Sequence, residues 1–196
     1  MTTGPAPSPA PSPGPTDPAV PAVPAVALHG DLLAVRALVF GPCGLACSEA
    51  VPEPESADYA AHALLLDGRA VRFRVAKTTP AKAGQFVTVW KRSPAGPIAP
   101  FDTADGIDLV VVSCRDGRHA GRFGQFVFPV EALRRHGVVS ENGSGGKRGF
   151  RVYPPWATTA GGQASRTQAW QLDHYLDVPE DGTPLDLVRA RALYGR

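Results

Sequence analysis

The chain has 196 residues, 43% of them hydrophobic, which is enough to bury the core of one domain. Its formal net charge of +2 conceals a basic centre, because 15 lysines and arginines face six acids between Gly68 and Trp156. Three cysteines lack a regular spacing, and no apolar run reaches the roughly 18–20 residues that cross a bilayer. These features argue against a disulfide scaffold and a membrane partner, and they favour a cytoplasmic protein with an anionic partner.

The first part of the chain, residues 1–26, consists almost entirely of Pro, Ala, Ser, Gly, Thr and Val. A segment of this composition cannot bury enough apolar surface to offset its ordering entropy. We therefore expect a disordered tail with polyproline II character. The rest, residues 27–196, is expected to form a single domain.

Local patterns predict the elements of that domain in chain order. Asp31 precedes apolar residues at helical spacing, which predicts a helix with Asp31 as its N-cap. Asp67-Gly68 separates two strand-like runs, 58–66 and 70–77, and this predicts a β-hairpin. The apolar run Ile107–Cys114 is typical of a central strand covered on both faces. Further strands are expected at 85–92, 124–128 and 150–153, and further helices at 129–136, 163–176 and 185–194.

Taken together, these elements predict an α/β (α+β) fold. Its sheet is expected to be mixed and largely antiparallel, because the hairpins dominate the strand order, and helices should flank it. The doubled motif Gly-Gln-Phe-Val, at 84–87 and 124–127, follows a turn each time and begins a strand. Turn chemistry explains both copies without a catalytic role.

The most basic stretch, residues 69–92, carries seven lysines and arginines and no acid. Its apolar residues alternate, so the cations are expected to stand in rows on strands. Aromatic residues neighbour cations here and again near residues 151–156, an arrangement that suits stacked bases and bound phosphates. We therefore predict non-catalytic binding of DNA or RNA. The expected contacts are Arg74, Lys77, Lys82, Trp90, Lys91, Arg92, Lys147, Arg148, Arg151, Tyr153 and Trp156.

Two other interpretations of the basic surface remain open. In one, the cations are simply solvated; in the other, the surface binds an acidic protein as a regulatory module. The glycine-rich stretch 143–149 is not a P-loop, because Arg148 stands where Ser or Thr is required and a strand follows. Its backbone amides, with Lys147 and Arg148, nevertheless offer donors to a backbone phosphate.

Four long motifs resemble those of the MepB family. They are KTTPAKAGQFVTVWKR (77–92), GQFVFP (124–129), GKRGFRVYPPW (146–156) and QASRTQAWQ (163–171), in this order. The resemblance implies a soluble α/β protein and suggests a link to nucleic acids. Members of the family often carry Lys where this chain has Val130, so no role that needs an ammonium group is expected at that position.

The predicted element order also resembles the core of PD-(D/E)xK nucleases, in which carboxylates and a lysine bind Mg²⁺ and activate water. The candidate catalytic residues for this alternative are Asp108, Glu55 and Gln125. Gln125 brings no charge to a metal, and Val127 stands where the lysine is needed. We therefore expect binding without cleavage, and no metal or cofactor unless the nuclease alternative holds.

Overall fold

A six-stranded sheet forms the centre of the structure, a computed structural model that describes Met1 and residues 28–92, 96–118 and 121–195. The strand order is β1-β2-β3-β8-β9-β11, and every neighbouring pair is antiparallel except β3 and β8. This confirms the mixed, largely antiparallel sheet. Apart from Met1, the tail expected at residues 1–26 lies outside the described residues. The strands are β1 Val51–Pro52, β2 His62–Leu66, β3 Arg69–Val75, β8 Leu109–Arg115, β9 Phe123–Pro129 and β11 Tyr175–Asp177.

Two smaller sheets accompany the central one. The first has the order β10-β5-β4 and the second pairs β6 with β7, all antiparallel. Strand β10 brings the third of the four family motifs, 146–156, against β5, which lies more than 60 residues earlier in the chain. These strands are β4 Lys77–Thr78, β5 Gln85–Thr88, β6 Trp90–Arg92, β7 Ile98–Pro100 and β10 Gly149–Val152.

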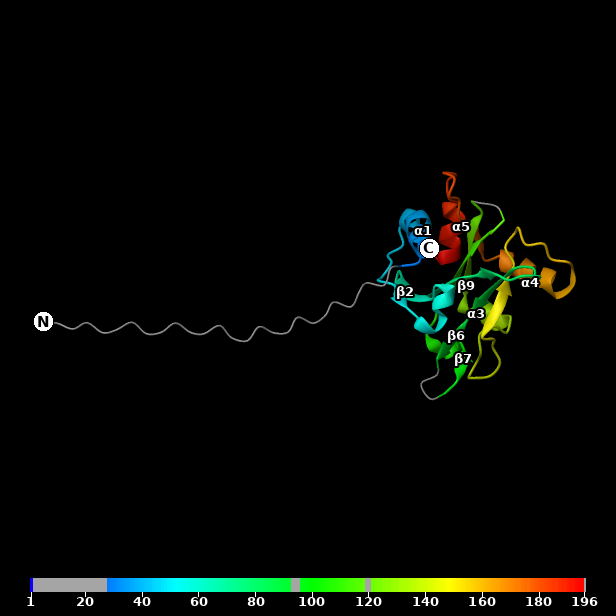
Figure 1. Cartoon of the computed structure of the whole chain (residues 1–196), viewed down its shortest axis with the longest axis horizontal. Coiled ribbons are helices and arrows are strands. Elements are labelled where there is room, and N and C mark those ends of the chain that lie inside the picture. Colours follow the sequence, from blue (N-terminus) through cyan, green and yellow to red (C-terminus); the bar gives the residue numbers. More distant parts are fainter. Residues whose placement is uncertain (2–27, 93–95, 119–120, 196) are drawn as a thin grey trace.

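Helices flank the central sheet, as the sequence predicts. Near the C-terminus, α5 lies beside α1 (Figure 1), and the ring of Phe40 meets that of Tyr194 edge-on at 5.6 Å. No helix among the described residues is long and apolar enough to cross a membrane. The helices are α1 Gly30–Val35, the π-helical η1 Arg36–Phe40, α2 Gly41–Cys43, the 3-10 helices η2 Pro54–Tyr59 and η3 Thr103–Asp105, α3 Val130–Arg135, α4 Gly162–Leu172 and α5 Leu187–Tyr194.

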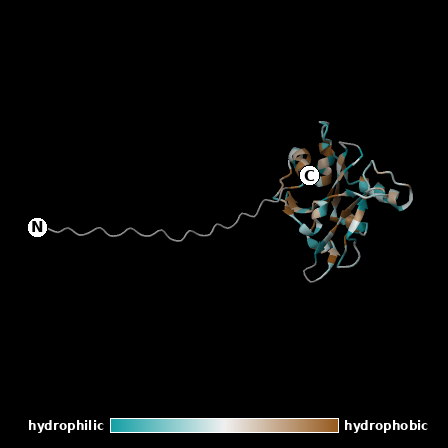
Figure 2. Ribbon diagram, in the orientation of Figure 1, coloured by the Kyte–Doolittle hydropathy of each residue, from teal (hydrophilic) through white to brown (hydrophobic). Residues whose placement is uncertain are grey.

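Strand β8 separates two hydrophobic cores. Leu109 and Val111 pack into the first core, with the helices at the two ends of the described chain, whereas Val110 and Val112 pack into the second, with β5, β10 and α3. All four are essentially inaccessible to solvent, which confirms a central strand covered on both faces. Hydrophobic residues accordingly recur along the strands in the body of the molecule (Figure 2).

Local predictions hold at the turn and shift at the helix and strand ends. Asp67 and Gly68 have φ of +48° and +80°, the left-handed pair of a tight hairpin turn. The first helix begins two residues earlier than predicted, because the His29 ring, and not the Asp31 side chain, accepts the capping hydrogen bond. Asp31 instead pairs with Arg115 at 2.6 Å, a contact 84 residues away that sequence spacing does not reveal.

Gly124 in the second Gly-Gln-Phe-Val motif tests the packing of β9 against β11. A Cβ at this position would overlap the hydroxyl and ring of Tyr175. We predict that Gly124→Ala lowers the free energy of unfolding by about 1–3 kcal/mol, the usual cost of overpacking a core. Urea unfolding measures it, with Gly30→Ala as control, since a Cβ at Gly30 meets nothing within 4 Å. Equal stability of the two variants would contradict this packing.

Candidate functional site

The first candidate site is a groove between α4 and strand β10, which we call the basic groove. Its volume is about 1060 Å³. Two of the four motifs line it, 146–156 from the side of β10 and 163–171 from α4. The lining residues are His136, Val138, Lys147, Phe150, Arg151, Tyr153, Gln163, Ala164, Arg166, Thr167, Ala169, Trp170 and Asp173.

Three cations contribute to the basic groove. Lys147 and Arg166 are exposed, and neither forms an ion pair within the part of the chain that the structure describes. Arg151 donates hydrogen bonds to Thr79 Oγ1 at 2.6 Å and to the carbonyl oxygens of Ala83 and Gly84, so its position is fixed. None of these partners is a carboxylate, so the positive charge of all three residues is retained at the groove.

Two glutamines of α4 position the walls of the groove. The buried Gln171 accepts the Tyr153 N–H at 2.8 Å and donates to the Arg151 carbonyl at 2.9 Å, so its carboxamide takes the place of a neighbouring strand. Gln168 donates to the carbonyl oxygens of Pro154 and Ala157, both at 3.0 Å. The chain from Arg151 to Ala157 is therefore held against α4, which fixes the backbone that carries Tyr153.

An aromatic pair closes one end of the groove. The His136 ring stacks on Trp170 with 3.9 Å between centroids and 7° between planes. Burial against this ring, together with the nearby charges of Arg135 and Lys147, holds the pKa of His136 below its usual value. His136 is therefore a neutral aromatic wall at neutral pH, and it leaves the positive charge to Lys147 and Arg166.

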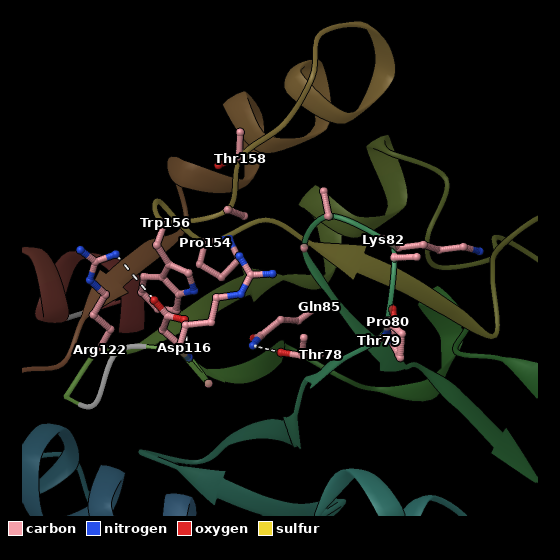
Figure 3. Close-up of a pocket in the computed structure, with 16 residues that line it drawn as sticks. Thr78, Thr79, Pro80, Lys82, Gln85, Asp116, Arg122, Pro154, Trp156 and Thr158 are labelled. Atoms are coloured by element: carbon pink, nitrogen blue, oxygen red, sulfur yellow. Dashed lines mark hydrogen bonds and ion pairs between the residues drawn. The ribbon is translucent and has the colours of Figure 1, made fainter.

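The second candidate site, which we call the Trp156 pocket, has a volume of about 690 Å³. The loop after β4, the turn between β8 and β9, and the chain after β10 form its walls. Figure 3 shows the Trp156 indole beside the Asp116–Arg122 ion pair, whereas Lys82 extends away from them. The lining residues are Thr78, Thr79, Pro80, Ala81, Lys82, Ala83, Gly84, Gln85, Asp116, Gly117, Arg118, Arg122, Pro154, Trp156, Ala157 and Thr158.

Five of the predicted contacts thus line the two hollows: Lys147, Arg151 and Tyr153 the groove, and Lys82 and Trp156 the pocket. The predictions missed the other cations of both sites. Arg166 lies in the motif at 163–171, so the sequence alone could have suggested it as a contact. Arg118 and Arg122 stand in a turn whose place beside Trp156 depends on the fold.

Arg74 does not lie on the predicted surface. Its side chain is fully buried, with the guanidinium 2.5 Å from the Glu53 carboxylate and 5.5 Å from the centre of the Phe101 ring. The strand pattern predicted an exposed row because it could not show that a second layer covers this face of β3. Arg72 pairs with the same carboxylate at 3.3 Å. Two of the seven cations of residues 69–92, Arg72 and Arg74, are therefore paired with a carboxylate of the protein itself.

The remaining predicted contacts lie outside both sites. Lys91 forms an ion pair with Asp105, and the Lys77 ammonium lies 5.1 Å from the centre of the Tyr59 ring. Trp90 lines a separate hollow of about 380 Å³ together with Glu55. Arg92 and Arg148 are exposed and line neither the groove nor the pocket.

The glycine-rich loop turns its amides inward. Asp102 accepts the Gly143 N–H at 2.9 Å and the Ser140 hydroxyl at 2.7 Å. The amides of Ser144 and Lys147 donate to the carbonyl oxygens of Glu141 and Val138. These three amides are not available to a phosphate, because the loop uses them to fold on itself.

The residues of the nuclease alternative do not converge. The Val130 N–H donates to the Asp108 carbonyl, and Gln125 lies five residues from Val130 along β9, roughly 16 Å at the usual strand rise. Gln125 is buried and bonds to Ser113 and Tyr194, whereas Glu55 belongs to the hollow beside Trp90. Within the described residues, no three His, Cys, Asp or Glu side chains are grouped to hold a metal ion.

The fold and the two hollows define a class: a small α+β protein whose basic sites lie beside a strand that α4 holds in place. The MepB-like family model matches residues 53–177, so the chain belongs to the MepB-like family. The crystal structure of MepB is similar to it at 30% identity with a TM-score of 0.62, covering 67% of this chain and 86% of that one. No curated protein matched the sequence.

The buried ion pair predicts a stability effect. Removing the partner carboxylate by Glu53→Ala leaves Arg74 charged and buried, where desolvation lowers its pKa. We expect a loss of about 3–5 kcal/mol of unfolding free energy, measured in urea. Glu131→Ala removes a carboxylate from the exposed Arg134 and serves as the control, with no measurable loss. If both variants behave alike, Arg74 is not the structural residue described above.

Asp102 predicts an acid-dependent effect. Hydrogen bonds from Ser140, Ala104 and Gly143 lower its pKa to about 2, below the unfolded value of about 3.9. Its contribution to stability is complete above pH 4 and lost as the pH falls towards 2. Asp102→Asn should lower the melting temperature at pH 5 and flatten its decline between pH 4 and 2, as followed by circular dichroism. The exposed Asp173→Asn should keep the wild-type profile; an unchanged acid profile in Asp102→Asn would refute the assignment.

Proposed function

We propose that the protein binds single-stranded nucleic acid in the basic groove and does not cleave it. The observation that supports this proposal most directly is the pair Lys147 and Arg166, two cations that line one groove and have no carboxylate partner among the described residues. A strand of phosphates offers negative charge to these two cations, and its binding releases counterions.

The other residues of the groove suit a strand better than a compact anion. Tyr153 provides a ring on which a base can stack, and Gln163 and Thr167 provide hydrogen-bonding groups that do not depend on base identity. Arg151 is held by three hydrogen bonds, so it presents its charge without paying further conformational entropy on binding. Binding is therefore expected to tolerate many sequences.

The absence of cleavage is part of the proposal. Two observations support it. Asp108 is hydrogen-bonded to Val130, at the end of β9 that is far from Gln125. Both polar groups of the Gln125 carboxamide form hydrogen bonds within the core. A carboxylate-rich metal site is what two-metal and one-metal nucleases use to activate water. An acidic protein partner would contact the same cations, and the experiment below separates it from a nucleic acid.

Fluorescence anisotropy with a labelled single-stranded DNA of mixed sequence tests the proposal. We expect log K to fall linearly with log salt, and Lys147→Ala/Arg166→Ala to reduce the slope by about 1.4, or about 0.7 for each lost phosphate contact. Arg134→Ala is the matched control, because Glu131 and Glu141 already neutralise that charge.

Three outcomes would contradict the proposal. They are no binding at low salt, unchanged binding by the double variant, and Mg²⁺-dependent cleavage of the DNA that Asp108→Ala abolishes. If the protein instead retains an acidic protein after nuclease treatment while ignoring DNA, the groove is a protein-binding surface.

A further inference from the structure

The walls of the Trp156 pocket are held in place by hydrogen bonds of two residues, Arg151 and Gln168, that also belong to the strand and helix of the basic groove. Arg151 fixes one wall through Thr79, Ala83 and Gly84, at donor–acceptor distances of 2.6–3.4 Å. Gln168 fixes another through the carbonyl oxygens of Pro154 and Ala157. Its volume, about 690 Å³, falls within the range of small-ligand sites, roughly 300–1,000 Å³. The pocket is thus preformed, and ligand binding need not order its walls.

The pocket combines an aromatic side chain, Trp156, with two positively charged arginines. The Trp156 indole lines the pocket and is half-buried, so it offers an aromatic surface to a planar ligand. Arg118 and Arg122 project from a single turn, which Asp116 holds by accepting the Arg118 N–H at 3.0 Å and donating its own N–H to the Arg122 carbonyl. Both arginine side chains are exposed, and both line the pocket.

Gln85 adds a polar group that the protein leaves unsatisfied. Its Nε2 donates to the Arg115 carbonyl at 2.6 Å and to Thr78 Oγ1 at 3.1 Å, which fixes the orientation of the carboxamide. Gln85 is 6% exposed, and its Oε1 has no hydrogen-bond partner among the described residues. A buried carbonyl without a donor is unfavourable, because it has lost its hydrogen bonds to water without gaining another. Because Gln85 lines the pocket, a ligand N–H, directly or through one water, can supply that donor.

From these three features we propose that the Trp156 pocket binds a nucleoside 5′-monophosphate unit, either free or at the end of a strand. The base stacks on Trp156, its N–H groups lie toward Gln85 Oε1, and the phosphate lies between Arg118 and Arg122. Base stacking on an aromatic residue is favourable for every base, and a phosphate between two guanidinium groups adds charge-assisted hydrogen bonds. A sugar phosphate without a base leaves Trp156 uncovered, and a base without a phosphate leaves the arginines unused.

Isothermal titration calorimetry with adenosine 5′-monophosphate tests this inference on the full chain. The wild-type protein should bind it at least tenfold more tightly than adenosine or inorganic phosphate. Trp156→Ala should weaken binding of the nucleotide about tenfold or more. Arg118→Ala/Arg122→Ala, at two exposed positions, should reduce its affinity to that of adenosine, with an unchanged circular dichroism spectrum as the control for folding. No binding by the wild-type protein at millimolar nucleotide, or full binding by the arginine variant, would overturn the inference.

Two further arms separate the sources of the ligand and the two sites. A short oligonucleotide with a 5′-phosphate, compared with its 5′-hydroxyl counterpart, assigns the pocket to strand ends if the phosphate improves binding tenfold, and to free nucleotides if it does not. The groove variant Lys147→Ala/Arg166→Ala should bind adenosine 5′-monophosphate like the wild type. The pocket can therefore fail to bind the nucleotide while the groove still binds DNA, and the groove can fail to bind DNA while the pocket still binds the nucleotide. Each proposal is thus tested by its own measurement.

Discussion

The carboxamide of Gln171 closes the free edge of strand β10, and both hollows depend on this contact. It donates to the Arg151 carbonyl and accepts the Tyr153 N–H, which gives a short edge strand the hydrogen bonds of a neighbour that it lacks. The same strand then carries Arg151, whose guanidinium ties down the loop from Thr79 to Gly84. The groove lies on the α4 side of this strand, and the pocket lies beyond the loop that Arg151 holds. A single buried glutamine thus couples α4, β10 and the loop after β4.

Charge within this fold serves two purposes that the primary sequence does not distinguish. Arg74 and Arg72 neutralise Glu53, Lys91 neutralises Asp105, and Arg115 bridges Asp31 and Glu180, so these cations stabilise contacts between distant segments. Lys147 and Arg166 have no such partner in the described parts of the chain. A buried ion pair also carries a desolvation cost, so its removal from one side is expected to be more damaging than the loss of an exposed cation. The net positive charge between Gly68 and Trp156 therefore does not by itself identify a binding surface.

Predictions from the sequence succeeded where short-range chemistry decides the outcome. Asp67-Gly68 adopts the left-handed pair that a hairpin turn requires, and the apolar run that contains β8 is covered on both faces. The family resemblance held across residues 53–177. Of the predicted contacts, Lys147, Arg151 and Tyr153 line the same groove, because they stand in one short motif beside a strand. It misplaced Arg74, because alternation identifies two faces of a strand but not whether a second layer covers the polar one.

The amino-acid sequence by itself determined the fold class, the positions of the tight turn and the central strand, the family, and the concentration of positive charge between Gly68 and Trp156, whereas the helix expected at 163–176 ends at Leu172 and is followed by β11. These follow from residue spacing, turn chemistry and composition, which act over a few residues. Only the tertiary structure decided which cations are neutralised, that α4 faces β10, and that the turn with Arg118 and Arg122 lies beside Trp156. Such relations depend on strand order and on contacts between residues up to 125 positions apart, such as the hydrogen bond from Arg69 to the Tyr194 carbonyl. No local pattern encodes them, because the free energy of each contact depends on what the rest of the fold brings to it.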